Sequence, residues 1–190
     1  MQAFRGKAII FSAPSGSGKT TLVKHLLAIS SDLSFSVSAT TRPPRANEVH
    51  GVDYYFLSSD EFRERIEQQD FIEWEEVYPN RFYGTLKSEI DRIWQSRKNV
   101  IFDIDVKGGI ALKAYFGDRA LAVFVKAPSL TELRRRLTQR ATDPSDSIEQ
   151  RVQKAAYEMS FGERFDLIIT NNHLATSLAM AQRAYADFCK

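Results

Sequence analysis

Short runs of apolar residues alternate along the chain with longer segments of helical periodicity. Four such runs occupy residues 8–11, 100–104, 121–125 and 167–169, and each is nearly continuous in apolar side chains. Continuous apolar strands are typical of parallel sheets whose two faces are both covered by helices. The alternation of these strands with helices therefore predicts an α/β fold of three layers around a mostly parallel sheet.

The helical segments carry start signals of the capping-box type, in which a serine precedes a glutamate or glutamine by three residues. A further helix is expected over residues 174–188, near the end of the chain. Three pairs of residues predict helix starts of this kind: Ser58 with Glu61, Ser129 with Glu132, and Ser147 with Gln150.

Two stretches interrupt this alternation. Residues 36–85 are rich in Tyr, Phe and β-forming residues, with Pro43, Pro44 and Gly51 as breaks, which predicts an inserted and partly antiparallel subdomain. Residues 141–146 are polar and connect two predicted helices, a composition typical of a mobile flap. We therefore expect one domain with a core over residues 1–35, 86–126 and 152–190, and a lid over residues 127–151.

Composition is that of an ordinary globular domain. The chain has 190 residues, a net charge of +2 and 43% hydrophobic residues, so charge indicates neither a nucleic-acid nor a membrane partner. The one cysteine, Cys189, excludes a disulfide within the chain. Apolar runs fall short of the roughly 20 residues of a membrane helix, and the N-terminal residues lack the apolar core of a signal peptide. These features favour a cytoplasmic location.

The segment after the first predicted strand carries the clearest chemical signal. Residues 13–20 read A-P-S-G-S-G-K-T, which matches the phosphate-loop pattern G-x-x-x-x-G-K-[ST] except that Ala13 replaces the first glycine. Glycines in such a loop let backbone N–H groups point at phosphate oxygens. The lysine charge lies between the β- and γ-phosphates, and the Thr20 hydroxyl can bind Mg²⁺. The pattern predicts a bound nucleoside triphosphate in contact with Ala13, Pro14, Ser15, Gly16, Ser17, Gly18, Lys19, Thr20 and Thr21.

Further motifs along the chain resemble those of the guanylate kinase family. They occupy residues 36–45, 53–56, 71–74, 83–85 and 103–108. The resemblance extends over essentially the whole chain, so it is far more specific than the phosphate loop. It implies a P-loop kinase that uses Mg²⁺ to transfer the γ-phosphoryl group of ATP to GMP, giving ADP and GDP in purine nucleotide metabolism and GMP recycling. The implied partners are ATP and GMP.

The resemblance also implies which residues bind GMP. Arginine guanidinium groups bind phosphate oxygens in pairs, and tyrosine hydroxyls add neutral donors. Guanine offers N1–H and its 2-amino group side by side, so one carboxylate can accept both, whereas adenine leaves that carboxylate unpaired. The implied phosphate contacts are Arg42, Arg45, Tyr54 and Tyr83. The implied base contacts are Ser38, Glu73, Thr85 and Asp105.

Positioned cations are the main catalytic device in phosphoryl transfer, because charge spreads over the oxygens of the transferring group. Arg136 and Arg140 are four residues apart and so share one face of a helix. Arg134 and Arg135 are interpreted as solvated helix residues. The catalytic set implied by the resemblance is Lys19, Arg42, Arg136, Arg140 and Arg151.

The metal and adenine contacts are assigned less directly, and two positions differ from the usual family pattern. Asp103 ends a predicted strand, where its carboxylate can hold Mg²⁺ through water or can instead cap the following turn. By resemblance, Asn171 or Asn172 contacts the adenine or its ribose. Ala141 stands where the family usually has glycine, which puts the mobility of the flap in doubt, and Lys107 stands where the family often has glutamine.

Two other functions compete with this one. A guanylate-kinase-like binding module without catalysis would keep the fold, but such modules typically lack the phosphate-loop lysine and the lid arginines. A nucleoside monophosphate kinase with another acceptor would keep the loop, but Glu73, Ser38 and Asp105 argue against it. An assay of GMP, AMP, CMP and UMP as acceptors distinguishes the three.

Overall fold

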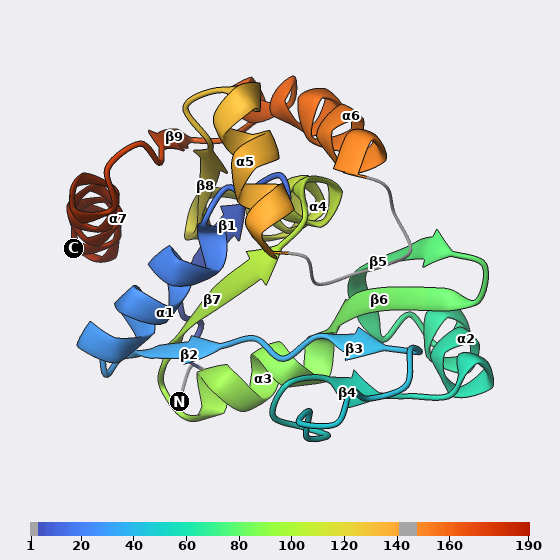
Figure 1. Cartoon of the computed structure of the whole chain (residues 1–190). Coiled ribbons are helices and arrows are strands. Elements are labelled where there is room, and N and C mark those ends of the chain that lie inside the picture. The colour runs from blue at the N-terminus through green and yellow to red at the C-terminus, as the bar shows by residue number, and fades with distance from the viewer. Residues whose placement is uncertain (1–3, 141–147) are drawn as a thin grey trace.

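The computed structural model describes residues 4–140 and 148–190, and its centre is a parallel sheet (Figure 1). The sheet has five strands in the order β2-β7-β1-β8-β9, and all of its pairings are parallel. The four predicted strands are confirmed, and β2 is an additional edge strand. The bounds are β1 (Ala8–Ser12), β2 (Leu33–Phe35), β7 (Asn99–Ile104), β8 (Ala120–Lys126) and β9 (Leu167–Thr170).

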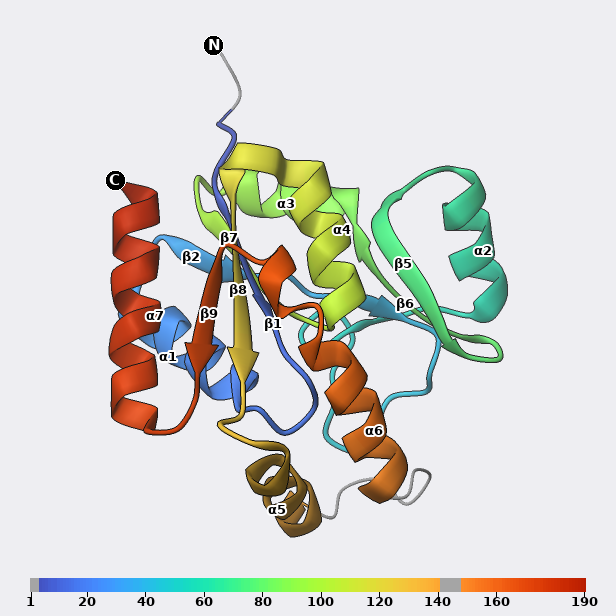
Figure 2. The ribbon, with the colours of Figure 1, turned by 90° about the horizontal axis from the view of Figure 1, so that it is seen from above.

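Helices cover both faces of this sheet. Successive residues of a strand point to opposite sides, so strands that are apolar throughout have two faces to bury. Ile9 and Phe11 of β1 face the first and last helices of the chain, whereas Ala8 and Ile10 face the other pair. Figure 2 shows the two pairs on opposite sides of the strands, so the predicted three-layer fold is confirmed. The first pair is α1 (Lys19–Ile29) and α7 (Leu174–Cys189), and the second is α3 (Lys87–Gln95) and α4 (Val106–Phe116).

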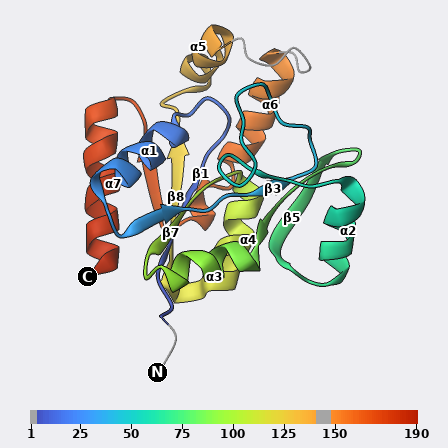
Figure 3. The ribbon, with the colours of Figure 1, turned by 90° about the horizontal axis from the view of Figure 1, so that it is seen from below.

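A second, smaller sheet lies beside α4 (Figure 3). It has four strands in the order β4-β3-β6-β5, with β3 and β4 parallel and the other pairs antiparallel. Phe62 of the covering helix stacks on Phe71 and Phe82, with ring centroids 4.3 and 5.3 Å apart. The elements are β3 (Ala39–Thr40), β4 (Tyr55–Phe56), α2 (Ser59–Glu67), β5 (Phe71–Tyr78) and β6 (Arg81–Leu86).

Two further helices, α5 (Leu130–Arg140) and α6 (Ile148–Met159), lie beyond the carboxyl ends of the central strands (Figure 2). Short 3-10 helices, Gly117–Arg119 and Gly162–Arg164, precede β8 and β9. The predicted flap at residues 141–146 lies outside the described residues. Among the residues that are described, we find no helix whose length and apolar character suffice to cross a membrane.

The predicted helix starts differ in how completely they form. At Ser58 the capping box is complete, because Glu61 N–H donates to the serine hydroxyl at 3.1 Å and Ser58 N–H donates to the glutamate at 2.7 Å. At Ser129 one half forms, through Glu132 N–H at 3.1 Å. The Glu132 carboxylate accepts instead from two guanidinium groups of its own helix. Ser147 lies outside the described residues.

Candidate active site

The phosphate loop connects β1 to α1, as its pattern predicts. Gly16 and Gly18 have φ angles of 87° and 92°, which glycine adopts without steric cost. A Cβ on Gly18 would lie 2.3 Å from Nδ2 of Asn171. The first turn of α1 contains no acidic residue and no side-chain cap. The N-terminus of α1, which is the positive end of its helix dipole, is directed at the loop. Because no acidic side chain or side-chain cap neutralises it, it favours a phosphate group there.

Ala13 shows why this loop tolerates a residue other than glycine at its first position. Ala13 is only 6% exposed, and it belongs to the core cluster that contains Phe11 and Leu22. It is not among the described residues with positive φ. Its backbone therefore has no need of glycine, and its methyl group contributes to the core.

Ala13→Gly is expected to lower the free energy of unfolding by about 1 kcal/mol, because it removes a buried methyl group and makes the unfolded chain more flexible. The affinity for ATP should stay unchanged. Urea unfolding and calorimetric titration with ATP measure the two quantities. A gain in ATP affinity would mean that the alanine distorts the loop, which would contradict this prediction.

Lys19 is held at the mouth of the loop by the carboxyl end of β7. Its Nζ lies 2.9 Å from Oδ1 of Asp103 and also donates to the carbonyl oxygen of Ile104. Asp103 therefore does not cap the next turn. That role belongs to Asp105, whose Oδ1 accepts from Gly108 N–H at 2.7 Å at the start of α4.

A cleft of about 470 Å³ extends from the phosphate loop to the second sheet, a volume suited to small-molecule ligands. Residues 13–21 form one wall, and Thr20 and Thr21 are exposed there. Asp103 and Asp105 line the cleft beside the loop. The second sheet, the loop that follows β3, and α6 supply the remaining residues, of which four were predicted: Arg42, Arg45, Tyr83 and Arg151.

Four further residues that belong to none of the predicted sites also line the cleft. Arg81 lies two residues before Tyr83 on β6, so both point to the same side of the strand. On α6, Lys154 and Glu158 follow Arg151 by three and seven residues, so all three lie on the same face of the helix. Residue spacing alone could have identified three of these positions, whereas Tyr78 lies on the neighbouring strand β5, opposite Arg81. The four residues are Tyr78, Arg81, Lys154 and Glu158.

The Arg42 side chain is held between a carboxylate and aromatic rings. Its two terminal nitrogens donate to the Glu48 carboxylate at 2.5 and 2.6 Å, and its guanidinium carbon lies 4.8 Å from the centroid of the Tyr54 ring. These hydrogen bonds lower the pKa of Glu48 to about 2, so the pair is ionised at neutral pH. Burial raises the pKa of Tyr54, whose ring meets that of Tyr83 edge-on at 6.1 Å.

Glu73 and Thr85 face each other across β5 and β6. The Thr85 hydroxyl donates to Oε1 of Glu73 at 2.6 Å. Burial raises the pKa of Glu73 to about 7, and the nearby charge of Asp105 acts in the same direction. A partly buried carboxylate with such a pKa is a candidate for binding a hydrogen-bond donor. Ser38 lies elsewhere on the second sheet, directly before β3, where its carbonyl oxygen accepts from Tyr55 N–H at 2.9 Å.

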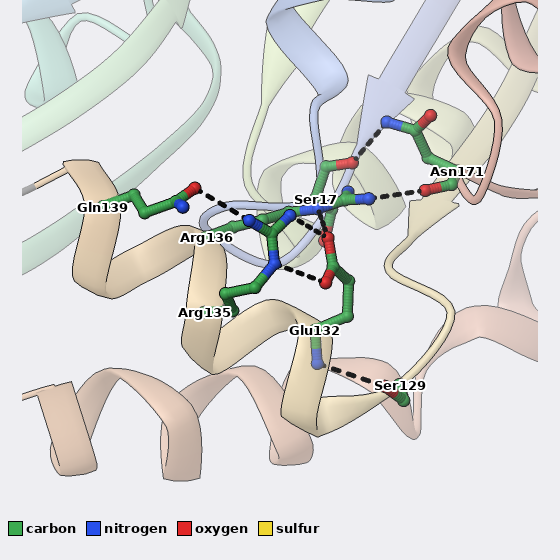
Figure 4. Close-up of polar contacts among 7 residues, drawn as sticks. All are labelled: Ser17, Ser129, Glu132, Arg135, Arg136, Gln139 and Asn171. Carbon is green, nitrogen blue, oxygen red and sulfur yellow. Dashed lines mark hydrogen bonds and ion pairs between the residues drawn. The ribbon is translucent and has the colours of Figure 1, made fainter.

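Arg136 and Asn171 are linked to the phosphate loop by hydrogen bonds on the side away from the cleft (Figure 4). Arg136 donates to Glu132 at 2.8 Å and to the carbonyl oxygen of Asn171 at 2.9 Å. The Asn171 amide in turn donates to the Ser17 carbonyl oxygen at 2.9 Å, and Asn171 is only 6% exposed. In this arrangement Arg136 and Asn171 hold the loop in place and lie outside the residues that line the cleft.

The other arginines of α5 and α6 differ in position. Arg151 donates to the Ser15 hydroxyl at 3.1 Å and lines the cleft. Arg134 and Arg135 are exposed and form ion pairs at the surface, which confirms their interpretation as solvated helix residues. The side chain of Arg140, and Ala141 beside it, lie outside the described residues.

Thr20 and Asp103 have the chemistry of partial magnesium ligands. They offer a hydroxyl and a carboxylate oxygen in the cleft, and Mg²⁺ prefers oxygen ligands while keeping several waters and substrate phosphates. The described part of the chain contains no group of three or more His, Cys, Asp or Glu side chains that could hold a metal ion. The residues therefore fit a magnesium ion that arrives with a nucleotide.

Comparisons with known proteins agree on one family. The family model for guanylate kinase matches residues 5–187. The guanylate kinase of Bacteroides fragilis is 53% identical over 182 residues, which cover 96% of this chain and 89% of that protein. The guanylate kinase of Porphyromonas gingivalis is 51% identical over 183 residues, which cover 96% and 97%.

A solved structure agrees as well. The crystal structure of guanylate kinase from Anaplasma phagocytophilum matches with a TM-score of 0.71 and 26% identity, over 100% of this chain and 89% of that one. The matches cover 96% of this chain in both sequence relatives and all of it in the solved structure. The chain therefore belongs to the guanylate kinase family.

Proposed function

We propose that this chain transfers the γ-phosphoryl group of ATP to GMP and releases ADP and GDP. One observation carries the proposal: a single cleft has the phosphate loop on one wall and Arg42, Arg45 and Tyr83 on another. Two phosphate-binding surfaces that face one cleft suit a reaction in which phosphate passes between two nucleotides. Membership of the guanylate kinase family supports GMP as the acceptor.

On the donor side, we assign ATP to residues 13–21. Lys19 would exchange its contact with Asp103 for the β- and γ-phosphates, and the Thr20 hydroxyl and Asp103 would hold Mg²⁺ directly or through water. When bound, the ion neutralises charge on the phosphate oxygens. Asn171 fixes the loop through Ser17, so we propose that it acts on ATP indirectly.

On the acceptor side, we assign GMP to the subdomain over residues 36–85 together with Asp105. Glu73 would accept N1–H and the 2-amino group of guanine, while Thr85 holds one of its oxygens. Ser38 would complete the base site. The phosphate contacts would be Arg42, Arg45, Tyr54 and Tyr83.

In the transfer itself, a phosphate oxygen of GMP attacks the γ-phosphorus of ATP. The bond between the γ-phosphorus and the oxygen that bridges the β- and γ-phosphates breaks, and ADP leaves. Arg151 already contacts the loop through Ser15, and it is suited to stabilise charge on the transferring group. We propose that residues 127–151 close as a lid and bring Arg136 and Arg140 to the same phosphate oxygens. Closure excludes water, which would otherwise compete as the acceptor.

Product analysis tests this function directly. The chain is incubated with ATP, Mg²⁺ and GMP, and the nucleotides are separated by chromatography. We expect GDP and ADP in equal amounts, and no turnover after addition of EDTA. Release of ADP without GDP would indicate an ATPase, and binding of both nucleotides without turnover would indicate a binding module.

The affinity for GMP is expected to weaken as the pH falls below about 7. Burial raises the pKa of Glu73 to about 7, and only its ionised form accepts both guanine donors. The dissociation constant should rise by up to about tenfold per pH unit below this pKa and level off above it. Calorimetric titration with GMP between pH 5.5 and pH 8.5 measures this profile, on the order of three pH units wide.

The phosphate of GMP also titrates, near pH 6, so a control is needed. Glu73→Gln removes the carboxyl titration and keeps that of the phosphate. The difference between the two profiles should therefore have its midpoint near pH 7. Identical profiles for the two proteins would contradict the role of Glu73.

A further inference from the structure

Glu89 is a buried carboxylate that lies outside the cleft. It belongs to the first turn of α3 and is only 2% exposed, a degree of burial that is rare for an acidic residue unless it is paired. Oε1 accepts from Val37 N–H at 3.0 Å and from Arg92 at 2.8 Å. Oε2 accepts from the Tyr55 hydroxyl at 2.8 Å and from Arg92 at 2.8 Å. Each oxygen thus accepts two hydrogen bonds, which fills its capacity.

The partners of Glu89 lie next to proposed GMP contacts. Val37 connects β2 of the central sheet to β3 of the second sheet, and it directly precedes Ser38. Tyr55 begins β4 and directly follows Tyr54. The two segments are also joined to each other, because Tyr55 N–H donates to the Ser38 carbonyl oxygen at 2.9 Å. One carboxylate on α3 therefore holds two segments of the second sheet.

We propose that Glu89 is a positioning residue for GMP, which fixes the second sheet on α3 so that Ser38 and Tyr54 reach the base and the phosphate of one nucleotide. This inference rests on the function proposed above. The hydrogen bonds involve a charged acceptor, which makes them stronger and more directional than neutral ones. Arg92 balances the charge from the solvent side, with 53% of its side chain exposed.

The surrounding contacts support a geometric role. Buried ion pairs add little net stability compared with well-packed apolar side chains, whereas they restrict how neighbouring elements are oriented. A second ion pair, between Lys107 of α4 and Glu75 of β5 at 2.7 Å, also joins the two parts of the protein. Lys107 is 69% exposed, so water screens this pair and it restrains the second sheet weakly. Glu89 is the stronger of these two links.

Glu89→Gln tests the proposal, because the amide keeps the size of the side chain but turns a donor towards the donors of Arg92. We expect KM for GMP to rise about tenfold or more, the effect of losing hydrogen bonds to a charged group. KM for ATP should stay within about twofold of the wild-type value, since the phosphate loop does not contact Glu89. Calorimetry with GMP alone should show the same loss of affinity.

Two matched controls separate positioning from general effects. Asp91→Asn makes the same carboxylate-to-amide change at an exposed position of the same helix. Lys107→Gln removes the exposed link between α4 and β5. Both variants should keep the wild-type KM for GMP. A variant that was merely less stable would lose active protein, and so lower kcat, without changing KM for GMP selectively.

Tyr55→Phe provides a second test that does not disturb the buried charge. It removes one donor to Glu89 and should raise KM for GMP by about threefold to tenfold. Its effect should be smaller in the Glu89→Gln background than in the wild type, because both changes act on the same set of hydrogen bonds. If Glu89→Gln does not fold, Tyr55→Phe decides: an unchanged KM for GMP overturns the proposal.

The outcomes also separate this inference from the proposed function. A wild-type protein that fails to phosphorylate GMP refutes the proposed function. If the wild type phosphorylates GMP normally but Glu89→Gln leaves its KM for GMP unchanged, only the positioning role is refuted. Equal increases in KM for GMP and ATP would likewise overturn it, because they would point to a general disturbance of the fold.

Discussion

Lys19→Ala should lower kcat by about 10³-fold or more while leaving the affinity for GMP unchanged. The Lys19 ammonium group is pre-positioned by Asp103 at 2.9 Å and by the Ile104 carbonyl, on the loop side of the cleft. Its charge would meet the phosphates of ATP, whereas the proposed GMP contacts other than Asp105 lie in the subdomain over residues 36–85. Steady-state kinetics with both substrates, and calorimetry with GMP, measure the two effects.

Lys24→Ala is the matched control for this prediction. Lys24 lies on the same helix, five residues further along, and is exposed. Its loss should leave kcat unchanged. Because Lys19→Ala leaves Asp103 without its ion-pair partner, thermal unfolding should be recorded for both variants. A folded Lys19→Ala protein with wild-type turnover would show that the lysine has no role in the transfer.

Glu73→Gln should raise KM for GMP by about 10²-fold or more, with little change in KM for ATP. The amide offers one acceptor where guanine needs two, and its N–H₂ group would face the donors of the base. Thr85 also loses a charged partner for its hydroxyl. The same loss of affinity should appear in calorimetry with GMP.

Glu76→Gln serves as the control, since Glu76 lies on the same strand but is exposed, with its carboxylate on Asn80 N–H. An amide oxygen can still accept that hydrogen bond, so KM for GMP should stay unchanged. If Glu73→Gln raised KM for ATP more than KM for GMP, the base site would have been misplaced.

The fold could be predicted where local pattern and tertiary packing agree. The apolar strands at the centre were visible because both of their faces are buried. Strand β2 has only three residues, Leu33–Phe35, which is too short to show a pattern. Helix α4 contains Gly108 and Gly109, which disfavour helix in isolation. A Cβ on Gly109 would lie 2.0 Å from the Ser12 hydroxyl, so close packing against β1 accounts for a glycine there.

The site was predictable to a similar extent. The phosphate loop is a local motif, and the resemblance to guanylate kinases supplied half of the other cleft residues. Sequence could not show that Arg136 contacts Asn171, because that contact depends on how α5 meets the end of β9. It also could not show that Glu89 is buried, since a glutamate in a helix usually faces solvent.

The ratio of kcat/KM for GMP to that for AMP tests the central claim most directly. Both values come from one ADP-release assay with saturating ATP and Mg²⁺. Because Glu73 would be left unpaired by adenine, we predict a ratio of about 10⁴ or more in favour of GMP. A ratio near one, or a preference for AMP, would contradict the assignment of the second sheet as a guanine-binding surface.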